Sequence, residues 1–551
     1  MLYDYDAFSR LAGSPDPPPE AGADYRVRLR PLSSSRPIRS VLITVFAFLF
    51  EATFFGWLLT SVSGRSPVIS AVLLVIELFR MVNVVTLCLA TLRARDPVPV
   101  PPDPGLRVAF LTTIVPGKEP IAMVEHTLRA AQRVLHPGTY HLWLLDEGDD
   151  TAVKAMCDRV GAHHFSRRGV PEWNLPAGGF KARTKHGNYN AWMDAHGGEY
   201  DVFVSVDPDH VPLPSFCERL LGYFRDPDVA FVVGPQVYGN YDNLVTRWAE
   251  SQQYLFHSLL QRAGNLLGIP MLVGTNNAVR ISALRQIGGL QDSITEDMAT
   301  SLAVHATRNP LSGNRWKSVY TPDVLAVGEG PSSWTDLFSQ QHRWSRGTDE
   351  VVLSGFISRI RRLGVRRTLH YGLLMAYYPM TAIAWLLGAI TAVAHIVLGA
   401  EGVQVPQHVW TMLYVDAALF QVGLYLWNRR HNVSPHEEEG SSGAPGMMLS
   451  TLCAPVYVSS FLQTLLRRRA GFVVTPKGDS ASPDRLLTFA SHLRWAFFHA
   501  ALLTCAVATG RTDGFMWLWP ALNLVLCLAP PVLWTALRMA ARPALHVEKY
   551  A

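Results

Sequence analysis

The chain has 551 residues, of which 49% are hydrophobic and 17% are charged. Average soluble domains carry about 25% charged residues, so this composition argues against a wholly soluble protein and favours one sizeable soluble domain with several membrane spans. The formal charge of +5 comes from basic residues that cluster beside apolar segments, as at Arg467–Arg469. Such charge typically faces the cytoplasm and anionic lipid, which argues against nucleic acid as a partner. Six cysteines without C-x-x-C spacing predict reduced, buried thiols.

Residues 1–37 are polar and rich in proline, which predicts a disordered tail without a cleavable signal peptide. The apolar runs Val41–Val62 and Pro67–Leu92 each supply the roughly 20 residues that a helix needs to cross a bilayer. Residues 38–95 are therefore predicted to form a transmembrane hairpin. Arg93 closes it on the same side as the arginines of the tail.

Residues 96–366 have mixed polarity, with glycine and proline between short apolar runs. Runs of this length predict the buried strands of a sheet, separated by helices such as Ile121–Leu135. The candidate strands are Val108–Val115, His141–Leu145, Val202–Val206 and Ala230–Val233. We therefore expect an α/β domain with a Rossmann-like mixed sheet, inserted in an α-helical multi-pass membrane domain.

Long apolar runs return after residue 366. They are Tyr371–Gly399, Val409–Leu426, Met447–Leu466, Leu486–Ala508 and Phe515–Leu537. Basic residues flank the third run on both sides, and one crossing cannot begin and end on the same side of a membrane. We therefore predict that Met447–Leu466 is an interfacial or re-entrant helix within 431–484, between transmembrane hairpins at 367–430 and 485–551. This interpretation leaves about six spans, with both termini on the cytoplasmic side. Seven spans with an external C-terminus are the alternative.

Two carboxylates follow the strand Val202–Val206 directly. Asp207 and Asp209 lie two residues apart, so in extended chain they point the same way and can share one divalent cation. Mg²⁺ or Mn²⁺ there would neutralise the charge on a departing nucleoside diphosphate, and His210 can add a contact. A solvated turn is the alternative interpretation.

Other polar residues stand at the ends of predicted elements. Asp146 follows the strand His141–Leu145, where open α/β sheets bind ligands, and an acidic loop is the equal alternative interpretation. Lys185 and Asn188 offer an ammonium and an amide suited to a phosphate or ribose, although alone they indicate only a turn.

The signature Thr295-Glu296-Asp297 opens a predicted helix, so Asp297 can face a cleft and take a proton from a sugar hydroxyl. Helix capping by Thr295, with the acids at the positive end of the helix dipole, is the structural alternative. Gln340, Arg343 and Trp344 stand just before the membrane domain. A guanidinium can hold a diphosphate and an indole can stack on a sugar, although the pair is also an ordinary membrane anchor.

This ordered series of motifs resembles the processive family 2 glycosyltransferases, and among them the cellulose synthases. Further along the chain, Phe472–Gly478 is similar to the gating loop of bacterial cellulose synthases, which follows an interface helix there. The resemblance implies a GT-A catalytic domain in the cytoplasm.

The resemblance also implies roles by position. The catalytic group would be Asp297, with Glu296 and Thr295 beside it. The donor nucleotide sugar would contact Asp146, Lys185, Asn188, Asp207, Gln340 and Arg343. Mg²⁺ or Mn²⁺ would be bound by Asp207, Asp209 and His210. The acceptor sugar would contact Trp344, Gly274 and Thr275. The gating loop would act through Phe472, Thr475 and Lys477.

The implied activity is an inverting transfer that polymerises a UDP-sugar, with UDP-glucose favoured, into a β-linked glucan. The polymer would leave through a channel in the same chain, lined by aromatics such as Tyr377, Tyr378, Trp385 and Trp495. Expected partners are the donor, the growing polysaccharide and the plasma-membrane bilayer, with accessory secretion subunits or a second copy as further candidates.

Glu147 stands where the family has the second Asp of Asp-Asp-Gly, and Gln341 is also common in hyaluronan synthases, so donor and product stay open. The alternatives are a chitin-like or hyaluronan-like synthase that uses UDP-N-acetylglucosamine, a non-processive transferase to a lipid acceptor, and a transporter or scaffold with an inactive transferase domain.

Overall fold

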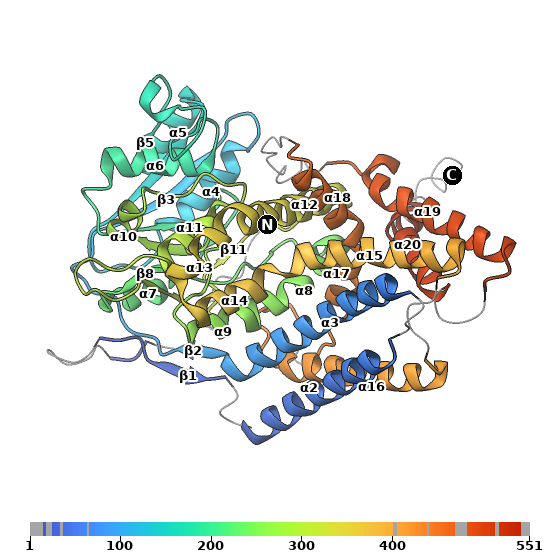
Figure 1. Ribbon diagram of the computed structural model, residues 1–551. Helices are drawn as coiled ribbons and strands as arrows, with labels where there is room; N and C mark the ends of the chain where they lie inside the picture. The colour runs from blue at the N-terminus through green and yellow to red at the C-terminus, as the bar shows by residue number, and fades with distance from the viewer. Residues whose placement is uncertain are drawn as a thin grey trace, which may run out of the picture.

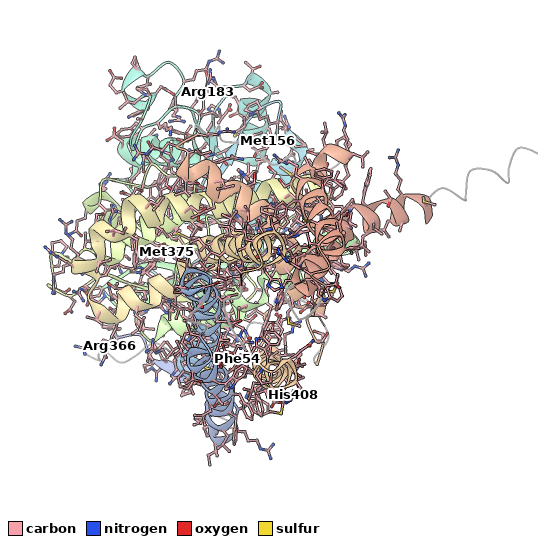
Figure 2. All side chains as sticks on the ribbon, turned by 45° about the vertical axis from the view of Figure 1, so that its right-hand side comes forward. Phe54, Met156, Arg183, Arg366, Met375 and His408 are labelled. Carbon is pink, nitrogen blue, oxygen red and sulfur yellow. The ribbon has the colours of Figure 1, made fainter. Side chains whose placement is uncertain are left out.

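The computed structural model describes residues 15–17, 25–32, 37–62, 66–400, 405–437, 440–468, 482–512 and 517–540. An α/β domain packs against one end of a set of long helices (Figure 1). In a second view, Met156 and Arg183 lie in the α/β domain, whereas Phe54 and His408 lie among the long helices (Figure 2). The predicted combination of a mixed α/β sheet with membrane-type helices is confirmed.

The central sheet has seven strands in the order β10-β8-β9-β6-β3-β4-β5. Their bounds are β3 Val108–Ile114, β4 Tyr140–Asp146, β5 His163–Phe165, β6 Val202–Ser205, β8 Val229–Val233, β9 Asn277–Arg280 and β10 Lys317–Tyr320. Strand β9 is antiparallel to both of its neighbours, and the other pairs are parallel. The carboxyl ends of β3, β4 and β6 therefore lie at one edge, where such sheets bind ligands.

Both faces of the sheet are covered, which explains why its strands are runs of apolar residues without alternation. On one face, Phe203 and Phe231 pack with Trp192 of α6 (Lys185–His196). On the other, Phe110 and Val204 pack with Phe216 of α7 (Phe216–Leu221). The remaining helices of the domain are α4 Ile121–Ala131, α5 Thr151–Val160, α10 Ile281–Gln286 and α11 Glu296–His305, with short helical turns η1 Pro171–Trp173 and η2 Gly222–Arg225.

Two small sheets tie segments that are distant in sequence. Strand β1 (Leu29–Pro31) pairs antiparallel with β2 (Arg95–Pro97), and the Val27 amide donates to Asp226 Oδ2 at 3.2 Å. The prediction of disorder over residues 1–37 is therefore wrong for this part of the tail, because backbone hydrogen bonds to the end of the first hairpin order it. Strand β7 (Val211–Pro212) pairs with β11 (Ala326–Val327) beside the metal motif.

The remaining helices of the described chain are long and short. They are α2 Pro37–Thr60, α3 Pro67–Arg93, α8 Leu244–Tyr254, η3 Leu255–Leu260, α9 Gln261–Asn265, α12 Trp334–Val351, η4 Val352–Phe356, α13 Ile357–Leu363, α14 Val365–Met375, α15 Tyr377–Leu398, α16 Gln407–Arg429, α17 Ala444–Leu452, α18 Ala454–Leu465, η6 Leu486–Phe489, α19 Ala490–Ala508 and α20 Leu518–Ala540. Five of the six cysteines are buried and Cys505 is half-buried, and all are free thiols.

Six helical segments within the described residues are long and apolar enough to cross a membrane, which agrees with the predicted number. The membership differs, because the segment Ala444–Leu465 qualifies whereas α19 does not. That segment is also the most enclosed of the six, since 56% of an 18-residue apolar stretch within it is buried. Its backbone breaks at Cys453 into α17 and α18, which pack on α8, α12 and α15. Neither piece alone has the roughly 20 residues of a span, so the interfacial or re-entrant placement stays a prediction.

Candidate active site

The metal motif lies at the carboxyl edge of the sheet, directly after β6. Ligand atoms of Asp207, Asp209 and His210 all lie within 4.8 Å of one another. The amide of Asp207 donates to Thr275 Oγ1 at 2.9 Å, and Asp209 Oδ2 accepts from the Glu329 amide at 3.2 Å. The buried imidazole of His210 has no hydrogen-bond partner for either nitrogen among the described residues. Two carboxylates and an unpartnered imidazole nitrogen fit Mg²⁺ or Mn²⁺.

Close packing fixes the orientation of the His210 ring. A Cβ added at Gly328, next to β11, would lie 2.3 Å from His210 Cε1. Real side chains do not approach that closely, so only glycine at 328 leaves room for the ring. The β7–β11 pairing brings this glycine to the metal motif.

Lys185 is the first residue of α6, and its ammonium lies between the metal motif and the opposite wall. It donates to Asp207 Oδ1 and, at 2.5 Å, to the carbonyl of Gly274. Burial opposes the charge of Lys185, but the charges of Asp207, Tyr189 and Glu296 and the hydrogen bond to Asp207 together outweigh burial, and the net effect raises the pKa of the lysine. A lysine that stays charged in this position can hold a phosphate or balance Asp207 when no ligand is bound.

Asp297 lies in the first turn of α11. Its side chain lines a large cavity that Lys185 and the metal motif also line. Burial, reinforced by the charge of Glu296, raises the pKa of Asp297 to about 7. A carboxylate that titrates near neutral pH suits a general base. A Cβ at Gly274 would lie 3.6 Å from Asp297 Oδ2, which places the Gly274 turn against the carboxylate.

The capping alternative for this signature is supported only in part. Thr295 occupies the position before α11, yet its side chain accepts no capping hydrogen bond, and its buried Oγ1 has no partner in the described part of the chain. Gly347 of α12 lies against it, since a Cβ there would be 2.4 Å from Thr295 Cγ2. The close approach joins the helix that bears the candidate base to α12.

Helix α12 presents one face to the cavity. Gln340, Arg343, Trp344 and Thr348 all line it, at the spacing of three and four residues that places side chains on one helix face. Gln341 also lines the cavity, and it donates to Gln252 Oε1 at 3.0 Å and accepts from the Tyr457 hydroxyl at 2.7 Å. Gln341 therefore anchors α12 to α8 and α18.

One cavity of about 2520 Å³ runs from the sheet edge into the long helices. Its α/β end is lined by Lys185, Asn188, Asp207, Asp209, His210, Gly274, Thr295, Glu296 and Asp297. Three of the four aromatics predicted to face a channel line its other end, namely Tyr377, Tyr378 and Trp385. Trp495 is not a lining residue, and it packs edge-on against Trp385 with ring centroids 5.9 Å apart. Polar and aromatic residues from both parts of the molecule thus line one continuous cavity.

Two of the predicted binding residues do not line this cavity. Asp146 is fully buried at the end of β4, and it accepts from the amides of Gly148 at 2.7 Å and Asp150 at 2.6 Å. Thr275 is also fully buried, and its hydroxyl holds the Asp207 backbone. Both residues shape the loops of the site, and their contact with donor or acceptor stays a prediction. The gating-loop positions Phe472, Thr475 and Lys477 lie outside the described residues.

Arg167 is an important residue that the sequence did not suggest. Its fully buried guanidinium forms a bidentate ion pair with the Glu147 carboxylate, at 3.1 and 2.8 Å. It also donates to the carbonyls of Trp173, Lys181 and Thr184. Arg167 therefore fixes the loop that leads to Lys185, and Glu147 is occupied by this pair. The sequence offered one sign of this role, because Arg167 comes just after the strand β5 and therefore lies at the same edge of the sheet.

Residues 202–423 match the family model described as Glycosyl transferase family group 2. A cellulose synthase catalytic subunit [UDP-forming] of Xanthomonas axonopodis pv. citri (strain 306) is 28% identical over 266 residues, which are 47% of this chain and 34% of the relative. Glucomannan 4-beta-mannosyltransferase 7 of Arabidopsis thaliana is 32% identical over 243 residues, 41% and 40% of the two chains. The chain is related to the group 2 glycosyltransferases. The predicted resemblance is thereby confirmed.

The chain spans about a third of the length of the cellulose synthase subunits that it matches. Among solved structures, a mannosyltransferase from Pyrobaculum calidifontis in complex with GDP-Man and Mn²⁺ superposes with a TM-score of 0.43 at 13% identity, covering 78% of this chain and all of that one.

Proposed function

We propose that this protein is a membrane-embedded, metal-dependent, inverting glycosyltransferase that polymerises a UDP-sugar into a β-linked glycan and passes the product along its own membrane helices. The observation that carries this proposal is the single cavity that joins Asp297 and the metal motif to the aromatic residues of α15. A soluble transferase acting on a small acceptor has no need for that connection.

Asp207, Asp209 and His210 would hold Mg²⁺ or Mn²⁺, which when bound supplies positive charge to the diphosphate of the donor. Lys185 and Arg343 face the same space and supply further positive charge for that diphosphate. Asn188, with a buried side-chain oxygen that has no partner in the described regions, is available to the nucleotide.

Asp297 takes the proton of an acceptor hydroxyl as that oxygen forms a bond to the anomeric carbon. The bond from the anomeric carbon to the diphosphate breaks, and the nucleoside diphosphate leaves with the bonding electrons. Attack from the face opposite the leaving group inverts the anomeric centre, so an α-linked donor yields a β-linkage. Trp344, four residues from Gln340 on the same helix face, is placed to stack on the acceptor ring.

UDP-glucose is the favoured donor, because the relatives with the cellulose synthase name are described as UDP-forming. A β-mannan synthase is the second candidate, supported by plant glucomannan mannosyltransferases that are 31–32% identical over 211 to 243 residues. We further place the α/β domain and both termini in the cytoplasm and the helices in the plasma membrane.

Membranes that contain the protein, incubated with labelled UDP-glucose, UDP-N-acetylglucosamine or GDP-mannose and Mg²⁺ or Mn²⁺, test these proposals. We expect long polymer from one of these donors with the wild type, and protection of that polymer inside sealed inverted vesicles from added glycosidase. Product that is entirely extractable into organic solvent would replace the polymerase with a lipid-acceptor transferase. Absence of transfer from every donor would favour the scaffold.

A further inference from the structure

The helix that carries Arg343 and Trp344 continues without a break into a basic, apolar surface segment. Helix α12 passes through the π-helical stretch η4 into α13, and Gly364, with φ of +75°, turns the chain into α14. The apolar side chains of this segment are unusually exposed for their type. Their exposed fractions are 53% for Leu353, 63% for Ile357, 38% for Ile360, 85% for Val365 and 48% for Leu369.

Arginines alternate with these apolar residues. Arg361, Arg362 and Arg366 are exposed, and none of the three forms an ion pair with any described residue. The charges also crowd one another, since burial and the neighbouring charge of Arg362 lower the pKa of Arg359. Figure 2 shows Arg366 at the outer edge of the molecule. We name Leu353, Ile357, Ile360, Arg361, Arg362, Val365, Arg366 and Leu369 the basic apolar face.

Several contacts place this face where the helices would enter a bilayer. Helix α14 packs against both α3 and α15, and Figure 1 shows it alongside α3. Only Ala376 separates α14 from the candidate span α15. The face therefore lies at the level of two span ends.

We propose that the basic apolar face binds anionic phospholipid at the membrane surface. Its isoleucine, valine and leucine side chains enter the boundary between headgroups and acyl chains, and Arg361, Arg362 and Arg366 contact the phosphates. Segments with this composition lie in the interface plane of membranes, and guanidinium groups match phosphate oxygens in pairs. A protein partner fits less well, because the face continues directly into a candidate span on a path that the bilayer surface would occupy.

The binding is independent of the proposed transferase activity and is measured without it. Ser358, which is exposed on α13, is replaced by cysteine and labelled with a fluorophore in the full-length protein. The protein is placed in nanodiscs with phosphatidylglycerol or phosphatidylcholine that carries a spin label near the headgroup. We expect stronger quenching by the labelled phosphatidylglycerol. Replacement of Arg361, Arg362 and Arg366 by glutamine should lower the preference for this lipid by about a hundredfold in apparent affinity.

Matched variants separate charge recognition from misfolding. Replacement of Arg129, Arg159 and Arg308, exposed arginines of the α/β domain, by glutamine removes the same charge and should leave the lipid preference unchanged. The Arg→Lys triple at 361, 362 and 366 keeps the charge and should keep most of the preference. Equal quenching by both lipids, or no quenching at all, would overturn the proposal. Loss of the preference on adding inorganic phosphate at constant ionic strength would identify a free phosphate site instead.

Discussion

Two clusters of acids with a cation, one in the α/β domain and one among the long helices, are built in opposite ways. In the first, Lys185 bonds to Asp207 while Asp209, His210 and Asp297 line the cavity around them. In the second, Arg80 of α3 lies 3.1 Å from Glu51 of α2 and 3.2 Å from Glu77. Its guanidinium also lies over the rings of Phe54 and Tyr414, at 4.4 and 4.6 Å.

We interpret the first cluster as a ligand site and the second as a structural ion-pair contact that holds helices together. The first cluster, at the α/β end of the cavity, has more carboxylate and imidazole atoms than Lys185 alone can pair with. A cation and a diphosphate therefore fit there. The membrane cluster encloses its arginine with two carboxylates and two rings from three helices, although Arg80 and Glu77 reach the cavity wall. Ion pairs between helices in a membrane otherwise mark functional sites, so experiments must test this distinction.

Replacement of Asp297 by asparagine is expected to have the largest effect on transfer. Asparagine keeps the shape but cannot accept the proton, so the rate should fall by about 10²–10⁴-fold. The rate is measured as transfer from labelled donor by membranes that contain the variant. Asp158→Asn, at an exposed position of α5, is the matched control. Unaltered polymer synthesis in the Asp297 variant would remove the proposed base.

Replacement of Arg80 by methionine should chiefly destabilise the protein. The two glutamates would be left facing each other without a cation, which costs about 3–5 kcal/mol of unfolding free energy. Thermal unfolding in detergent measures the loss. The triple variant with Glu51→Gln and Glu77→Gln should regain part of it. If Arg80→Met instead abolished polymer synthesis at unchanged thermal stability, the cluster would be a ligand site like the first cluster.

A side chain at Gly328 tests the metal site from outside its ligands. Gly328→Ala places a methyl group against the His210 ring, and we expect an affinity for Mn²⁺ lower by about tenfold. Titration followed by electron paramagnetic resonance measures it. Gly198→Ala, where a Cβ meets nothing within 4 Å, is the control. Equal affinities in the two variants would argue that His210 is not a ligand.

The pH dependence of transfer gives the most specific test of the proposed base, with up to about a tenfold change for each pH unit. The pKa of Asp297 is raised to about 7, so the base is protonated below that pH and ionised above it. The rate should therefore fall by up to about tenfold per unit below pH 7 and level off above it. Initial rates at constant ionic strength measure this profile. A level rate between pH 5 and 7 would contradict the assignment.

Several features were predictable because they depend on local pattern. Apolar run length indicated the strands and most spans, and carboxylates after β6 indicated the metal motif. Other features depended on tertiary contacts. The role of Asp146 depends on the path of the loop after β4, and the Arg167–Glu147 pair joins that loop to the one after β5. The segment Leu29–Pro31 is ordered as β1 because it pairs with residues more than sixty positions away.

The sequence by itself determined the sheet-plus-helices architecture, the likeness to group 2 glycosyltransferases and the residue types of the candidate site. Periodicity and order along the chain carry that information. Only the tertiary structure decided which of those residues share one cavity, that Thr275 supports Asp207 and that Gln341 is bonded to Gln252 and Tyr457. Distances between side chains depend on how α11, α12 and the sheet edge pack together, and no local pattern specifies that packing.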